Sequence, residues 1–154
     1  MSSNFIQRGG LWVVGQSVLL FAVVIFGVVF HGDGKNLLVM ACGAVFFVVA
    51  LCCGIAGTVA LGRNLTPFPK PSTHAQLVQG GIYGLMRHPL YTSVFCGSVG
   101  WALVWQSWPA FLVSLTLAPF FVAKARHEER WLRQQFPDYA CYEQHVRRFI
   151  PWIY

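Results

Sequence analysis

The chain has 154 residues, of which 56% are hydrophobic and only 10% are charged, and its formal net charge is +6. Soluble domains carry about 25% charged residues, so the composition excludes an ordinary soluble protein and predicts an integral membrane protein. The basic residues lie beside apolar segments, where anionic lipid accounts for them without a nucleic-acid partner. The cysteines form no C-x-x-C pair, which predicts buried thiols rather than a disulfide framework or a metal site.

Two uncharged segments, 11–30 and 37–61, dominate the first half of the chain. About 20 helical residues span roughly 30 Å, the thickness of a bilayer core, so each segment predicts a membrane helix. A signal peptide is the competing interpretation of the first segment, but its apolar core would be shorter and a small-x-small cleavage motif would follow. In the second segment, Ala50 and Gly54 have the spacing that lets helices pack closely in lipid.

The second half begins with the longest polar connection, 62–88, which contains three prolines and several apolar residues. A connection of this length in a small protein is unusual unless it carries function, and its apolar residues predict packing against the helices. Two further apolar segments, 89–105 and 108–123, are separated by a two-residue turn and predict a helical hairpin. The tail, 124–154, is again polar.

The positions of the charged residues predict the topology. Arg8 and the basic residues of 62–88 and 124–154 all fall on one side of a four-span arrangement, whereas the other side carries only Lys35, balanced by Asp33. The positive-inside rule then places both termini and the long connection in the cytoplasm. We therefore expect a single all-α membrane domain over 1–154, with four transmembrane helices and a cytoplasmic C-terminal helical segment, in a bacterial inner membrane.

Residues 80–91 read GGIYGLMRHPLY. Pro89 suits the first turn of a helix, so Arg87 and His88 are expected at the N-terminus of the third spanning helix, where unpaired N–H groups and the helix dipole favour an anion. One interpretation is an anion-binding site. The other is that Arg87 is an interfacial topology residue, pointing toward the pocket mouth or the lipid headgroups, and that His88 is a helix cap.

The tail begins with a segment, 124–136, whose pattern predicts a helix with Glu129 on its apolar face. An unpaired carboxylate at that place would be costly. The alternative is that Glu128 and Glu129 form surface ion pairs with the basic residues four positions away. Apolar residues spaced from Tyr139 to Phe149 predict a second short helix.

These motifs occur in a recognisable order: Leu77-Val78, Gly81-x-Tyr83, Arg87-His88-Pro89-x-Tyr91, a helical hairpin, Glu128-Glu129-x-x-Leu132, then Phe136, Tyr139, Tyr142, Val146 and Ile150-Pro151. The order resembles the isoprenylcysteine carboxyl methyltransferase and phospholipid N-methyltransferase superfamily of integral membrane enzymes. The resemblance covers about half of the chain, 65–152. Departures at Ile82, Gly84 and Ser93, where the family usually has Pro, often Arg, and Gly, are expected to alter the substrate mouth.

The resemblance implies S-adenosyl-L-methionine as the methyl donor, bound on the cytoplasmic side, and an apolar or lipid-like acceptor that enters laterally. The implied cofactor-binding residues are Leu77, Val78, Gly81, Tyr83, His88, Tyr91, Glu128 and Glu129. Arg87 and Glu129 are the implied catalytic residues, and Arg87, Tyr142 and Arg148 the implied substrate-binding residues. No metal is implied, and a lipid bilayer is the expected surrounding.

The sequence leaves the identity of the acceptor open, because a prenylcysteine carboxylate, a phospholipid amine and a small thiol are equally compatible with it. The rival class is a non-enzymatic four-helix membrane protein, such as a small transporter or an assembly subunit. A transporter should place ionisable residues inside its spans, and the four apolar segments contain no Asp, Glu, Lys or Arg. A soluble-type methyltransferase is excluded because no G-x-G-x-x-G motif follows a strand pattern.

Overall fold

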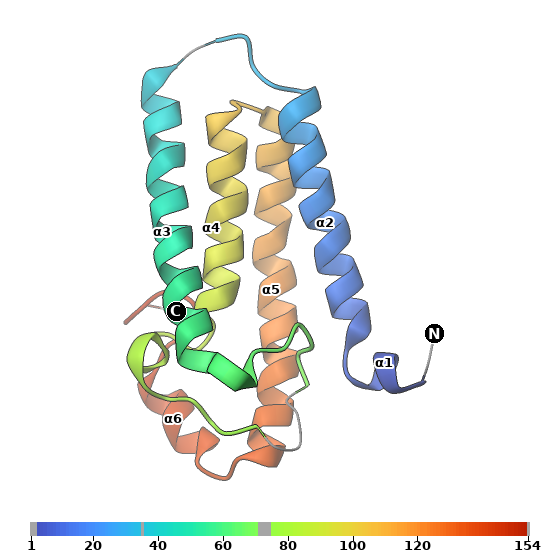
Figure 1. The fold of residues 1–154 in the computed structure, drawn as a ribbon, viewed down its shortest axis with the longest axis vertical. Helices are drawn as coiled ribbons and strands as arrows, with labels where there is room; N and C mark the ends of the chain where they lie inside the picture. The colour runs from blue at the N-terminus through green and yellow to red at the C-terminus, as the bar shows by residue number, and fades with distance from the viewer. Residues whose placement is uncertain (1–2, 35, 71–74, 154) are drawn as a thin grey trace.

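The computed structural model describes residues 3–34, 36–70 and 75–153 as a bundle of helices (Figure 1). Its four long helices are α2 (Gly10–Val29), α3 (Leu37–Leu61), α4 (Pro89–Val104) and α5 (Trp108–Gln135), with short α1 (Ser3–Gln7) before them and α6 (Tyr139–His145) after them. Two 3-10 helices, η1 (Gly62–Asn64) and η2 (Gly81–Gly84), lie in the connection between α3 and α4. The predicted all-α class is confirmed, since the described residues contain one isolated β-bridge and no strand.

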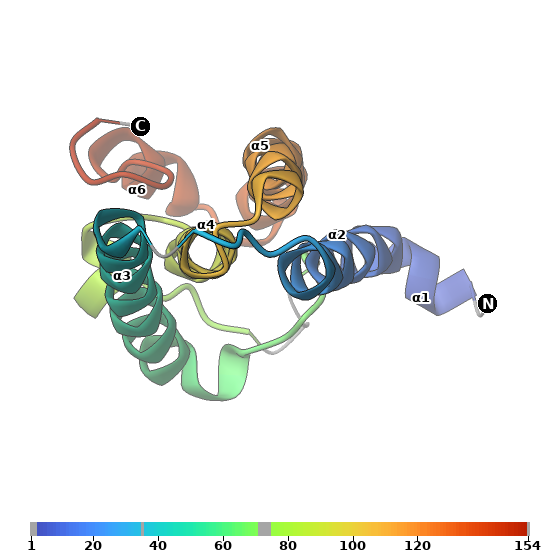
Figure 2. The same cartoon turned by 90° about the horizontal axis from the view of Figure 1, so that it is seen from above.

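The four long helices are not equivalent in length. Helices α2, α3 and α5 are long and apolar enough to cross a membrane, whereas α4 has 16 residues, or about 24 Å at 1.5 Å per residue. Seen from above, α4 lies in the middle of the bundle, with α2, α3 and α5 around it (Figure 2). The shortest helix is therefore the inner one, and its N-terminus carries the Arg-His-Pro motif.

Helices α3 and α4 approach each other closely because small residues face each other. A Cβ atom at Gly43 would lie 3.0 Å from the carbonyl oxygen of Gly100. Ser93 donates a hydrogen bond of 2.6 Å to the carbonyl oxygen of Ala50, and a Cβ atom at Gly54 would lie 2.8 Å from the Ser93 hydroxyl. The close packing predicted from Ala50 and Gly54 is thus confirmed, with α4 as the partner.

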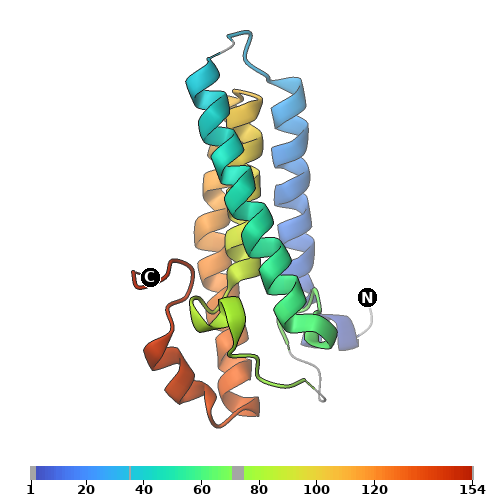
Figure 3. The ribbon, with the colours of Figure 1, turned by 60° about the vertical axis from the view of Figure 1, so that its left-hand side comes forward.

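The two ends of the bundle differ in chemistry. At one end, neutral groups join the two helical hairpins: the Gln106 side chain donates to the Asn36 carbonyl oxygen at 3.2 Å, and the Ser107 hydroxyl donates to the Phe26 carbonyl oxygen at 2.8 Å. At the other end lie α1, the connection between α3 and α4, the charged part of α5, and α6 (Figures 1 and 3). Lys35 and residues 71–74 lie outside the described residues.

The C-terminal region departs from the prediction in two respects. The fourth span and the predicted tail helix form one helix of 28 residues, α5. The second tail helix ends at His145 and does not reach Phe149. At Val146 the backbone turns to an extended conformation, and the backbone N–H groups of Arg87 and His88 donate to the carbonyl oxygens of Arg147 and Arg148 at 2.8 and 3.0 Å; bends and turns follow. The end of the chain thus runs beside the start of α4.

Candidate functional site

A cavity of about 620 Å³ opens at the charged end of the bundle, where α4 begins. Its volume lies within the range of roughly 300–1,000 Å³ that small-molecule sites occupy. The cavity wall includes the predicted site residues Leu77, Val78, Tyr83, Arg87, His88, Tyr91, Glu128 and Tyr142. Three other predicted residues, Gly81, Glu129 and Arg148, are not part of this wall. The functional roles of all these residues, inside and outside the wall, stay predictions.

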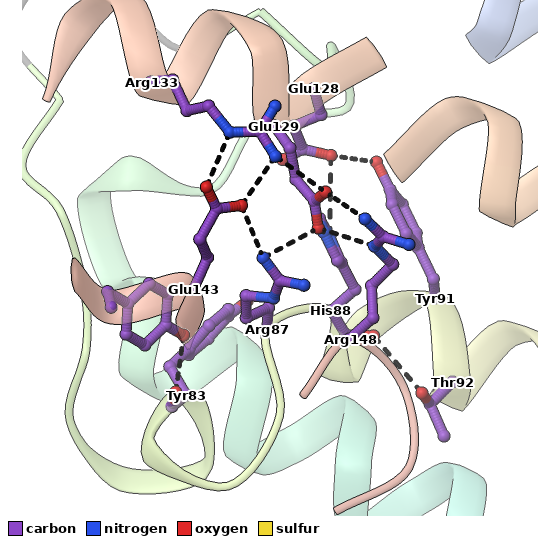
Figure 4. A network of polar contacts seen from close by, with 11 residues as sticks. Tyr83, Arg87, His88, Tyr91, Thr92, Glu128, Glu129, Arg133, Glu143 and Arg148 are labelled. Carbon is purple, nitrogen blue, oxygen red and sulfur yellow. Dashed lines mark hydrogen bonds and ion pairs between the residues drawn. The ribbon is translucent and has the colours of Figure 1, made fainter. Parts of the chain in front are cut away.

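Glu129 lies behind the wall, at the centre of a network of charged side chains (Figure 4). Its side chain is 1% exposed and accepts two hydrogen bonds from Arg148, at 2.9 and 2.7 Å. His88 Nε2 lies 3.1 Å and Arg87 Nη1 3.4 Å from its Oε1 atom. Glu129 is therefore the anion that Arg87 and His88 hold at the start of α4. The predicted ion pair with Arg133 is present at 4.0 Å, but Glu129 is buried, so its interpretation as a surface residue is wrong.

These partners keep the side chain of Glu129 charged. Glu129 lies in the charged part of α5, beyond the apolar segment 108–123. Burial alone would raise the pKa of Glu129, but hydrogen bonds from His88 and Arg148 and the positive charge of Arg87 lower that pKa to about 2. The carboxylate is thus ionised and compensated on several sides, as a buried charge requires.

A second carboxylate extends the network toward the surface. Glu143 on α6 accepts hydrogen bonds of 2.8 and 2.6 Å from Arg133 and of 3.1 Å from Arg87. The hydrogen bond from Arg133 lowers the pKa of Glu143 below its ordinary value. Arg87 is therefore held between two carboxylates, those of Glu129 and Glu143, and it joins α6 to the beginning of α4.

Glu128 has a different environment from Glu129, although the two residues are adjacent in the chain. It lines the cavity, its side chain is 24% exposed, and the Tyr91 hydroxyl donates to it at 2.5 Å. The Tyr91 ring stacks between the rings of His88 and Phe121, with centroid distances of 5.2 and 5.0 Å. These contacts fix the Tyr91 hydroxyl against the Glu128 carboxylate on the cavity wall.

Arg87 does not point toward lipid headgroups. Its side chain is 9% exposed and lines the cavity, and its Nε atom is buried without a hydrogen-bond partner in the described part of the chain. The hydroxyl of Tyr139, another wall residue, is buried and unpartnered in the same way. Buried donors normally find partners, so these two groups are exceptions within the packing behind the wall.

Several wall residues were not identified from the sequence. Gln16 lies within an apolar span, and Phe68 and Pro69 lie in the connection after α3, without a motif to mark them. Lys124 was predicted as the first residue of the tail and as a surface ion-pair partner of Glu128, yet it is buried in the wall with 3% of its surface exposed. The signal available in the sequence was that Lys124 directly follows an apolar segment, and that position indicated the end of a membrane span rather than a binding site.

The model of the phospholipid methyltransferase family matches residues 38–139 of this chain, from the beginning of α3 to the first residue of α6. The chain belongs to this family. The matched segment contains most of the cavity wall, including the connection, the start of α4 and both glutamates of α5. The resemblance predicted from the ordered motifs is thereby confirmed.

The chain is also similar to three curated relatives. The chain is 30% identical over 146 residues to the nickel-cobalt-cadmium resistance protein NccN of Alcaligenes xylosoxydans xylosoxydans, covering 94% of this chain and 65% of the relative. It is 30% identical over 99 residues to protein-S-isoprenylcysteine O-methyltransferase B of Arabidopsis thaliana, covering 62% of this chain and 50% of the relative. The cobalt-zinc-cadmium resistance protein CzcN of Cupriavidus metallidurans is 36% identical over 76 residues, covering 49% of this chain and 35% of the relative.

The matches cover only part of each relative. The chain spans at most about two thirds of the length of the relatives that it matches. Within the described residues, no group of three or more His, Cys, Asp or Glu side chains is arranged to hold a metal ion.

Proposed function

We propose that the protein is an S-adenosylmethionine-dependent methyltransferase that acts at the cytoplasmic face of the membrane on an apolar or lipid-like acceptor. The observation that carries this proposal is the cavity at the charged end of an apolar bundle, in a chain of the phospholipid methyltransferase family. The concentration of basic residues at that end supports a cytoplasmic orientation through the positive-inside rule.

The residues of the wall fit the chemical groups of S-adenosylmethionine. Glu128 can accept hydrogen bonds from the ammonium group or the ribose diol. Tyr83, another wall residue, offers an aromatic ring for the adenine ring or the sulfonium.

The bound cofactor would supply a methyl group on a positively charged sulfur for in-line displacement by a nucleophile of the acceptor. The chain's own task is then to align the two partners and to exclude water. The network behind the wall fixes His88 and Arg87, and the stack of His88, Tyr91 and Phe121 fixes the Tyr91 hydroxyl beside Glu128. Glu128 is the wall carboxylate available as a proton acceptor if the acceptor must lose a proton.

A second hollow supports an apolar acceptor. It has a volume of about 670 Å³ and lies along α3, with Ser93 and Gly97 of α4 in its lining. Gly54, Thr58 and Ser93 belong to both this hollow and the cavity, so the two adjoin. The hollow is lined largely by apolar and small side chains, as suits a hydrocarbon chain that arrives from the bilayer.

The proposal is tested by calorimetric titration of the purified protein with S-adenosylmethionine and with S-adenosylhomocysteine. We expect binding by the wild type and affinity weakened by about tenfold or more in His88→Ala, equivalent to about 1.4 kcal/mol. The matched control is His145→Ala, which removes an exposed histidine at the end of α6. A folded wild-type protein that binds neither compound would contradict the proposal and favour the non-enzymatic alternative.

A further inference from the structure

Lys124 is a buried cation in the cavity wall that does not belong to the network around Glu129. It lies on α5 one turn before Glu128. Its Nζ atom donates a hydrogen bond of 2.6 Å to the Gln16 side chain on α2 and lies 4.8 Å from the centre of the Tyr91 ring. Among the described residues, no carboxylate forms an ion pair with it.

This arrangement differs from that of the other buried cation of the wall. Arg87 has carboxylate oxygens at 3.1 and 3.4 Å, whereas Lys124 contacts one neutral amide oxygen and one aromatic face. Burial lowers the pKa of Lys124, and the charge of Glu128, one turn along α5 but without a direct ion pair, only partly offsets that effect. An ammonium group carries three donors, and Lys124 uses one of them in a hydrogen bond. Removing an ammonium from water without a counter-charge is costly, and that cost falls when an anion enters beside it.

We infer that Lys124 binds an anionic oxygen group, a carboxylate or a phosphate, of a molecule held in the cavity, and that Gln16 positions its ammonium group. The inference rests on the proposed function in one respect, since it takes the cavity to be a ligand site. The anionic group has two possible sources: the carboxylate of the cofactor, or an acidic head group of the apolar acceptor. Both present the same chemistry to Lys124.

A purely structural role for Lys124 gives a different expectation. If the lysine only ties α2 to α5, removing Gln16 should have the same consequences as removing Lys124. If it binds an anion, Gln16→Leu should keep most of the ligand affinity, because the charge persists. The loss of affinity should then be confined to Lys124→Met, and Lys124→Arg should restore part of it.

The experiment compares the wild type with these three variants and with Arg126→Met, which removes an exposed cation from the same helix. Affinities are measured for S-adenosylmethionine and for its decarboxylated analogue, and then for dodecanoate and dodecyl phosphate, with dodecanol as the uncharged control. Thermal unfolding in the same detergent shows that each variant is folded.

If the cofactor supplies the anion, Lys124→Met weakens S-adenosylmethionine binding by about tenfold or more but leaves the decarboxylated analogue within about twofold. If the acceptor supplies it, the same variant loses affinity for dodecanoate or dodecyl phosphate but not for dodecanol. Binding of every anionic probe within about twofold of the wild type would overturn the inference. A wild type that binds no S-adenosylmethionine contradicts the proposed function alone, and the dodecyl probes still test Lys124.

Discussion

The network around Glu129 and the cavity wall around Glu128 are built from adjacent residues of one helix, yet they differ in almost every physical respect. The Glu129 side chain is 1% exposed and is compensated by Arg87, His88 and Arg148. The Glu128 side chain is 24% exposed and accepts one hydrogen bond, from Tyr91. His88 lies between them, with Nε2 at 3.1 Å from Glu129 and Nδ1 at 3.9 Å from Glu128.

Two neighbouring carboxylates can thus have different roles, one in holding the site together and the other in contacting a ligand. Glu129 sets the shape of the site, because it joins α5 to the start of α4 and to the extended C-terminal segment. Glu128 offers its charge to the cavity. Variants of the two residues should therefore fail in different ways.

The largest effect is expected for Glu129→Ala. This change leaves Arg87, His88 and Arg148 without their shared carboxylate, and removing one partner from a buried ionic group costs about 3–5 kcal/mol. Chemical unfolding in detergent should show this loss in the free energy of unfolding. Glu128→Ala is the matched control and should lose about 1 kcal/mol. Equal stability of the two variants would refute the division of tasks.

Glu128→Gln should produce the complementary result. The amide keeps the shape of the side chain and an acceptor for the Tyr91 hydroxyl, so unfolding should change by less than about 1 kcal/mol. The charge facing the cavity is lost, and S-adenosylmethionine affinity should fall by about tenfold, or about 1.4 kcal/mol. Calorimetry on the folded variant measures this, and wild-type affinity would remove Glu128 from the proposed cofactor site.

The two glutamates also show which parts of the site could be predicted from the sequence. Both were identified as site residues from their motif, and the apolar face of the tail helix placed Glu129 inward. The sequence could not show that Glu129 meets His88, because the two are 41 positions apart and no local pattern encodes their contact. It therefore predicted an anion site at the start of α4 without identifying the anion as Glu129.

The same limit explains the other differences. The helices follow from apolar segments whose length and polarity are local properties, so the four long helices were predicted well. The segment after Val146 was predicted as helical because its apolar residues have helical spacing. Its non-helical course depends on backbone hydrogen bonds with Arg87 and His88, and these are tertiary. Gln16 was missed because a single amide in an apolar span resembles a packing residue until α5 is placed beside it.

Arg87 connects the two regions, since it lines the cavity and also contacts Glu129 and Glu143. Arg87→Lys keeps the charge but removes the planar fork and the unpartnered Nε atom. We expect cofactor affinity to stay within about threefold, roughly 0.6 kcal/mol. Turnover should fall at least about fivefold, near 1 kcal/mol. A lysine variant with full activity on the native acceptor would assign Arg87 to the network alone.

The smallest effect is expected at the outer edge of the network. Arg133 is 43% exposed and donates two hydrogen bonds to Glu143, and exposed ion pairs contribute about 0.2–1 kcal/mol. Arg133→Ala should therefore destabilise the protein by less than about 1 kcal/mol at pH 7, compared with Arg126→Ala as the control.

The hydrogen bond from Arg133 lowers the pKa of Glu143 below its ordinary value of 4.5. A carboxyl group whose pKa is lower in the folded state stabilises the protein fully above pH 4.5, and this contribution is lost as the pH falls through the lowered value. The difference between the wild type and Arg133→Ala should thus shrink as the pH falls below 4.5 in unfolding measurements. A difference that is independent of pH would show that Arg133 acts through packing rather than through its charge.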